Sequence, residues 1–190
     1  MGGQWGAWPR RVAIAAALAV LVFVLGACDF TTLTAARWGC GTHTYVVNPA
    51  RAPQGGVAAV HEAFRQLNAA SAGQVSWTYG GTTTATAARP GLVVVAWRPQ
   101  YEVPEVMRMG AWAVGAPQPW PNNVKWTGGV VFIDPRYRTD LGVVLHELGH
   151  IAGLGHVKNP QQVMYSNPRG KTHYMPGDAA GLLTLALQCK

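Results

Sequence analysis

The sequence predicts an α/β (α+β) protein in which helices pack on a mixed, twisted sheet of about five strands. Three observations support this: the order of the elements, short apolar runs typical of buried strands, and segments with helical spacing of apolar residues. The 190 residues are 49% hydrophobic and include 8 Trp, enough for one domain to bury a core. Only 12% of residues are charged, which excludes a coiled coil and a disordered charged tail.

The first half of the chain predicts three strands and one helix. Val57, Val60, Phe64 and Leu67 lie three or four positions apart, which predicts an amphipathic helix ending near Gly73. Strands are expected at residues 44–47, 75–79 and 92–97, and a Thr/Ala/Gly-rich loop at residues 80–89. Residues 98–109 are expected to form a surface loop.

The second half predicts two more strands and two helices. A short strand is expected at residues 111–114, followed by irregular chain at Pro117, Pro119 and Pro121. Residues 130–133 predict a buried strand. A helix is expected at residues 141–151, capped by Thr139 or Asp140, and a last helix begins with Asp178 as its cap.

The N-terminal residues 1–27 predict an export signal. Arg10 and Arg11 precede fourteen apolar residues (12–25), which is short for a permanent membrane span. The run ends in Leu-Gly-Ala-Cys, which resembles a bacterial lipobox with Cys28 as the lipidated residue. Ordinary cleavage and an uncleaved anchor are the alternatives. Residues 28–36 are expected to be a linker and residues 37–190 the domain, located outside the cytoplasm as a membrane lipoprotein or a secreted protein.

That compartment permits disulfides. If Cys28 carries lipid, Cys40 and Cys189 remain as an even pair, either bridged or as two free thiols. The formal charge is +7, but the basic residues are scattered and form no Lys/Arg run, which argues against nucleic acid as a partner.

Residues 146–156 read HELGHIAGLGH, and this segment carries the predicted chemistry. His146 and His150 are four positions apart, so on a helix they share one face and can reach one cation. Gly153 ends the helix, and the turn brings His156 back as a third ligand. Three His ligands leave one coordination position open, as in a catalytic zinc site, and Glu147 is placed to act on the water there.

This motif, followed by Met164, resembles that of the metzincin metallopeptidases, and the spacing is most similar to that of matrixins. The resemblance covers roughly residues 37–190 and implies a zincin-like fold, one catalytic Zn²⁺ and a Met-turn at Met164. It also implies that the protein is an endopeptidase acting on protein or peptide substrates, and we expect it to be a monomer. Substrate contacts are expected from the edge strand and from the wall beyond the scissile bond, at Ala111, Trp112, Ala113, Val114 and Tyr165.

The chain departs from the matrixin pattern at several positions. Val157 replaces the usual Ser, Phe132 stands where a His is common, and calcium binding at Asp134 and Asp140 is left open. A bridge from Cys40 to Cys189 is favoured over a Cys40 thiolate that blocks the zinc. His43, His61 and His173 are expected to be surface or core residues rather than a second zinc site. The alternative functions are a zinc-bearing binding or adhesion lipoprotein with little turnover, and a structural envelope protein with a vestigial motif.

Overall fold

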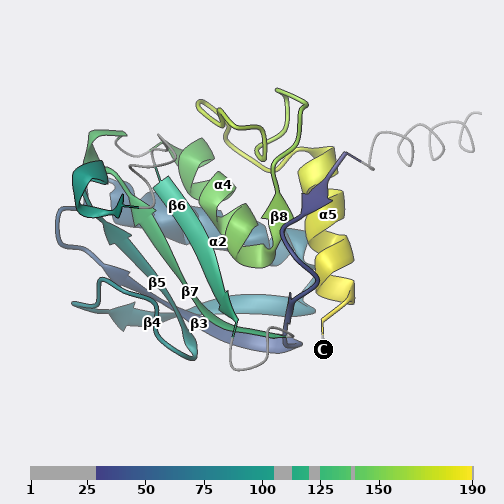
Figure 1. Cartoon of the computed structure of the whole chain (residues 1–190), viewed down its shortest axis with the longest axis horizontal. Coiled ribbons are helices and arrows are strands. Elements are labelled where there is room, and N and C mark those ends of the chain that lie inside the picture. Colours follow the sequence, from purple (N-terminus) through teal and green to yellow (C-terminus); the bar gives the residue numbers. More distant parts are fainter. Residues whose placement is uncertain (1–28, 105–112, 120–124, 138–139, 190) are drawn as a thin grey trace, which may run out of the picture.

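Figure 1 shows the computed structural model of the chain, which describes residues 29–104, 113–119, 125–137 and 140–189. The strands are β1 (Thr31–Thr32), β2 (Arg37–Trp38), β3 (Gly41–Asn48), β4 (Val75–Thr82), β5 (Leu92–Trp97), β6 (Ala113–Pro119), β7 (Lys125–Ile133) and β8 (Leu154–Gly155). The helices are α2 (Gly56–Ala70), α4 (Leu141–Ala152) and α5 (Pro176–Leu187), with short 3-10 turns η1 (Gln100–Glu102) and η2 (Pro135–Tyr137). No helix within these ranges is long and apolar enough to cross a membrane.

The main sheet is mixed, which confirms the predicted fold class. Strands β2, β7, β5, β3 and β4 are neighbours in that order, and each pairing among them is parallel. Strand β6 pairs antiparallel with β7. A separate antiparallel pair joins β1 to β8.

The helices bury one face of this sheet. Val60, Phe64 and Leu67 of α2 lie in the same core cluster as Leu145 and Leu148 of α4. Alternate residues of the central strands point to the other face, where they form a smaller cluster around Ala85. Its members from the strands are Val46, Val94 and Val130. The alternation along each strand therefore divides the apolar residues between two clusters.

Most of the expected elements are present, with longer bounds than predicted. The apolar spacing placed α2 correctly, and β5 has the predicted bounds. Strand β4 extends to Thr82, into the segment expected to be a loop, and β7 begins at Lys125 rather than at residue 130. Helix α4 begins after Asp140, whose carboxylate accepts a hydrogen bond from the Gly142 N–H at 2.9 Å.

Pro117 and Pro119 do not break the chain into an irregular segment, so the prediction was wrong at these two positions, and Pro121 lies outside the described residues. Strand β6 runs through Pro117 and Pro119, which pair with Gly129 and Trp126 of β7. In the part of the chain that the structure describes, β6 has β7 as its one strand neighbour, so it is an edge strand. An edge strand tolerates proline because a missing N–H on the open side removes no ladder hydrogen bond.

The segment expected to be a linker packs against the domain instead. Thr31 and Thr32 pair with Gly155 and Leu154, and the N–H of Leu33 donates to the Gly153 carbonyl at 2.9 Å. In Figure 1 this segment, in purple, runs beside β8 and α5. Two-residue strands have no periodicity in the sequence, which is why the linker prediction missed this pairing.

A disulfide joins the two ends of the domain. Cys40, directly before β3, is bonded to Cys189, two positions after the end of α5, and the two are 149 positions apart in sequence. Of the two alternatives for these thiols, the structure therefore has the bridge. This leaves no Cys40 thiolate to block the histidines.

Candidate metal centre

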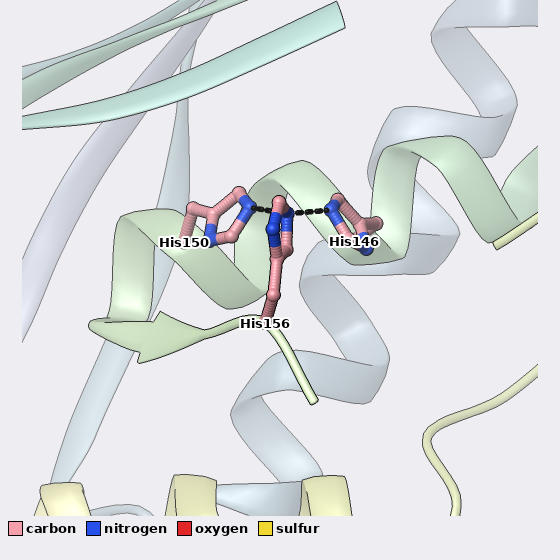
Figure 2. A group of neighbouring side chains, drawn as sticks. All are labelled: His146, His150 and His156. Carbon is pink, nitrogen blue, oxygen red and sulfur yellow. Dashed lines mark hydrogen bonds between the residues drawn. The ribbon is translucent and has the colours of Figure 1, made fainter. Parts of the chain in front are cut away.

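Helix α4 and the turn after it bring the three motif histidines together. His146 and His150 lie one helical turn apart on α4. Gly153 ends the helix with φ of 110°, a left-handed conformation that a residue with a Cβ adopts only with strain. The chain then turns back through β8, which places His156 opposite the helix (Figure 2).

The three imidazoles converge through their Nε2 atoms. The Nε2 of His156 lies 3.1 Å from the Nε2 of His146 and 3.1 Å from that of His150 (Figure 2). The three ligand atoms lie within 4.8 Å of one another, so together they can hold a metal ion. Tetrahedral ligation with Zn–N bonds near 2.05 Å places two nitrogens roughly 3.3 Å apart, close to the spacing seen here.

Hydrogen bonds to the backbone orient two of these rings. The Nδ1 of His146 lies 2.7 Å from the Val163 carbonyl oxygen, and the Nδ1 of His150 lies 2.8 Å from that of Leu154. A carbonyl can only accept, so each Nδ1 carries the proton and each Nε2 keeps its lone pair. Metal-binding histidines are held in this way, and the donor set therefore fits a cation such as Zn²⁺.

Burial keeps these two rings neutral. Desolvation, aided by the neighbouring His150, lowers the pKa of His146 to about 3. Desolvation also lowers the pKa of His150 to about 4, with His156 contributing. Both imidazoles are therefore in the form that binds metal at pH 7. Glu147 follows His146 on α4, and its side chain is also buried.

Met164 packs against α4 within the motif that carries the histidines. It is buried, and its sulfur lies against α4 at Gly149, where a Cβ would collide with it. The N–H of Val157 donates to the Met164 carbonyl at 3.0 Å, which ties the segment after His156 to the segment of Met164. The structure thus brings Met164 to the helix position directly before His150.

Comparison with known families adds an independent finding. The chain matches the family described as Matrixin over residues 53–183, which spans more than half of its length. The chain belongs to the matrixin family. It therefore carries a metallopeptidase domain, and the resemblance seen in the sequence is confirmed. A comparison with curated proteins found no match.

Sequence reasoning missed how the matrixin domain supports its metal centre from α5. Asp178 caps α5 from the third position of the helix, where its carboxylate accepts from the N–H of the N-cap residue Met175 at 3.0 Å, rather than from the N-cap position itself. Its buried carboxylate accepts from the N–H groups of Val163 at 2.8 Å and Met164 at 3.1 Å. The Val163 carbonyl, which orients His146, and the Met164 N–H, which donates to Asp178, belong to the same peptide unit. Asp178 therefore holds the group that orients His146. An acidic residue at a helix start was visible in the sequence, but its partners were not.

Tyr174 and Thr31 provide two further supports. The hydroxyl of Tyr174 donates to the Leu145 carbonyl at 2.8 Å, and burial raises the pKa of this phenol well above its usual value. The hydroxyl of Thr31 donates to the His156 carbonyl at 2.8 Å. The position of Thr31, in a stretch expected to be a linker, gave no signal of this contact.

The structure describes three of the five residues expected to contact substrate. Ala113 and Val114 lie on β6, opposite Ile133 and Phe132 of β7, and α4 contacts β6. Tyr165 is half-buried and pairs in a β-bridge with Val157, next to His156. Ala111, Trp112 and Cys28 lie outside the described residues.

The remaining histidines and carboxylates have other partners. His43 lies 2.8 Å from the Gly39 carbonyl, and His61 lies 2.8 Å from the Tyr45 hydroxyl. His173 lies beside Thr172. The carboxylate of Asp134 accepts from the backbone N–H of Gln100 and from Arg136, and that of Asp140 accepts from the N–H groups of Gly142 and Gly170. Within the described ranges, the motif histidines form the one group of three or more such residues suited to a metal.

Proposed function

We propose that the protein is a zinc-dependent endopeptidase that hydrolyses peptide bonds of extracellular or envelope proteins. The observation that supports this most directly is the convergence of three Nε2 atoms on α4 and its following turn, in a chain of the matrixin family. His146, His150 and His156 would hold the ion. When bound, Zn²⁺ would polarise the scissile carbonyl and lower the pKa of water toward about 7.

Glu147 would be the general base of this reaction. Its carboxylate takes a proton from the attacking water as the water oxygen bonds to the carbonyl carbon. It then passes the proton to the leaving nitrogen as the C–N bond breaks. Its place beside His146 on α4 supports this role, because the helix fixes its distance from the site.

Strand β6 would bind the substrate. In the described part of the chain it pairs with β7, and an open edge can accept an extended peptide as an additional strand. Ala113 and Val114 lie at the end of β6 that pairs with the carboxyl end of β7. Tyr165 would form the wall of the pocket beyond the scissile bond, since its bridge to Val157 holds it next to His156.

The sequence supports export of the protein and attachment to a membrane. The basic start, the apolar residues 12–25 and Cys28 after Leu-Gly-Ala support a lipoprotein signal, and the bridge between Cys40 and Cys189 suits an oxidising compartment. The protein would then act as a monomer near the outer surface of a membrane.

Cleavage of a diverse peptide library by the purified full chain tests the activity. We expect cleavage that a zinc chelator stops and that added Zn²⁺ restores. Glu147→Gln should retain zinc at one ion per chain and lose cleavage by about three orders of magnitude or more, whereas His150→Ala should lose both. Zinc binding without cleavage in the parent chain would instead support the alternative of a zinc-bearing binding protein. Full activity in Glu147→Gln would refute the base assignment.

A further inference from the structure

The outward face of α5 is uncharged and apolar. The only charged residue of α5 is Asp178, which is buried. Among the described residues, five large apolar side chains are exposed, and two of them, Leu183 and Leu187, lie four positions apart on this helix. Leu187 is 65% exposed. A surface helix of a soluble domain usually has charged residues on its solvent side, so this face is suited to an apolar environment.

The N-terminal segment runs along the same helix. A Cβ on Gly177, near the start of α5, would lie 2.8 Å from the Asp29 carbonyl, and one on Gly181 would lie 2.8 Å from Phe30. At the other end, the Arg37 Nε donates to the Gln188 side chain at 3.1 Å. Leu33, between Phe30 and Arg37 in the sequence, is 42% exposed. We name Leu33, Leu183 and Leu187 the leucine strip.

This packing begins at the first described residue, which follows Cys28 in the sequence. The described chain begins at Asp29, against the start of α5, and residues 31–33 are hydrogen-bonded to β8 and Gly153. Cys28 is bonded to Asp29, the residue that lies against the start of α5, and α5 is roughly 18 Å long at 1.5 Å per residue. A lipid anchor at Cys28 would therefore hold the leucine strip close to the bilayer.

We propose that the leucine strip is a membrane-docking surface that rests on a phospholipid bilayer when the N-terminal segment is anchored there. The apolar side chains enter the interface and no charged side chain of α5 has to be desolvated. Helix α4 contacts both β6 and α5, and lies between them in Figure 1. A bilayer against α5 therefore leaves the edge of β6 open. The inference does not depend on peptidase activity.

Photocrosslinking of the full chain in phosphatidylcholine–phosphatidylglycerol vesicles tests the proposal. A photoreactive benzoylphenylalanine at position 187 is compared with the same group at position 101, because Tyr101 is 70% exposed but lies on η1. We expect the yield of lipid adduct at position 187 to be at least about fivefold higher. Equal yields would overturn the proposal, as would crosslinks from position 187 to a second copy or to residues 12–25 in place of lipid.

Charge substitutions separate docking from simple proximity to the anchor. With the photoreactive group at position 187, Leu183→Glu should lower the yield of lipid adduct about fivefold, because a carboxylate resists burial in the interface. Leu33→Glu, on a different element, should do the same, and Tyr101→Glu should not. Circular dichroism and resistance to proteolysis confirm that each variant is folded. Unchanged lipid labelling in folded Leu183→Glu and Leu33→Glu chains would show that the strip does not dock.

Discussion

At the start of α5, the carboxylate of Asp178 accepts hydrogen bonds from three backbone N–H groups, those of Val163, Met164 and Met175. Burial raises the pKa of this carboxyl, so the three donors offset a real cost of desolvation. Asn at this position has one acceptor oxygen, and its NH₂ would face an N–H group. The Val163 peptide, whose carbonyl holds His146, would then shift.

Asp178→Asn should therefore weaken both folding and metal binding. We expect the free energy of unfolding to fall by about 1–3 kcal/mol and zinc affinity to fall about 10- to 100-fold, measured by urea unfolding and by competition with a chelator. Asp134→Asn is the matched control, because Asp134 is equally buried and also accepts from backbone N–H groups, at Gln100 and Arg136. It should lose stability and keep its zinc affinity. Equal zinc affinities in the two variants would contradict this account of Asp178.

The two buried histidines predict a pH dependence of the metal-free protein. Their folded pKa values, about 3 for His146 and about 4 for His150, lie below the usual 6.5. Between these values the unfolded chain binds protons that the folded chain does not, so stability falls as pH falls below 6.5. Lowering the pH from 7 to 5 should reduce the free energy of unfolding by about 2 kcal/mol for each histidine.

Urea unfolding at the two pH values, with a chelator present, measures this loss of stability. His150→Gln removes one of the two titrating groups and should lose about half as much stability over the same interval. A flat profile in the parent chain, or the same decline in both chains, would show that burial does not hold these rings neutral.

At the scale of elements, segments with a strong apolar periodicity were predictable from the sequence. Segments whose structure depends on pairing with residues distant in the sequence were not. The apolar spacing of α2 and the apolar run of β5 are local properties, and both elements are found where the sequence placed them. The metal motif is also local, since α4 and Gly153 are enough to bring its histidines together.

Strands β1 and β6 and the role of Asp178 depend instead on what lies beside them. Proline disrupts a central strand and is tolerated at an edge, and the sequence around Pro117 does not reveal which case applies. Likewise, the partner of Thr31 is the carbonyl of His156, 125 positions away, and no sequence spacing encodes that contact.

The contact between α4 and the Met164 segment gives a prediction at this scale. Gly149→Ala would place a Cβ against the sulfur of buried Met164, and we expect it to destabilise the metal-free protein by about 1–3 kcal/mol. In a Met164→Ala background the space is free. In that background, Gly149→Ala should raise the free energy of unfolding by up to about 1 kcal/mol, because Ala has a higher helix propensity than Gly.

Urea unfolding of the parent, the two single variants and the double variant forms a complete cycle. The sign of the effect of Gly149→Ala should change with the residue at position 164. Additive effects would mean that α4 and the Met164 segment are not coupled through this contact.

At the scale of the whole molecule, the bond between Cys40 and Cys189 ties the start of β3 to the end of α5, so nearly the whole domain lies within one covalent loop of 149 positions. In the chain-entropy model, a loop of this size lowers the entropy of the unfolded chain by an amount worth about 5 kcal/mol. Cys40→Ser with Cys189→Ser should lose roughly that much free energy of unfolding in urea, while Cys28→Ser should lose none. The histidine rings are oriented by local carbonyls, so the bridge-free protein should still bind one zinc ion while it is folded. An unchanged urea midpoint in the double variant would show that packing of α5 alone closes the domain.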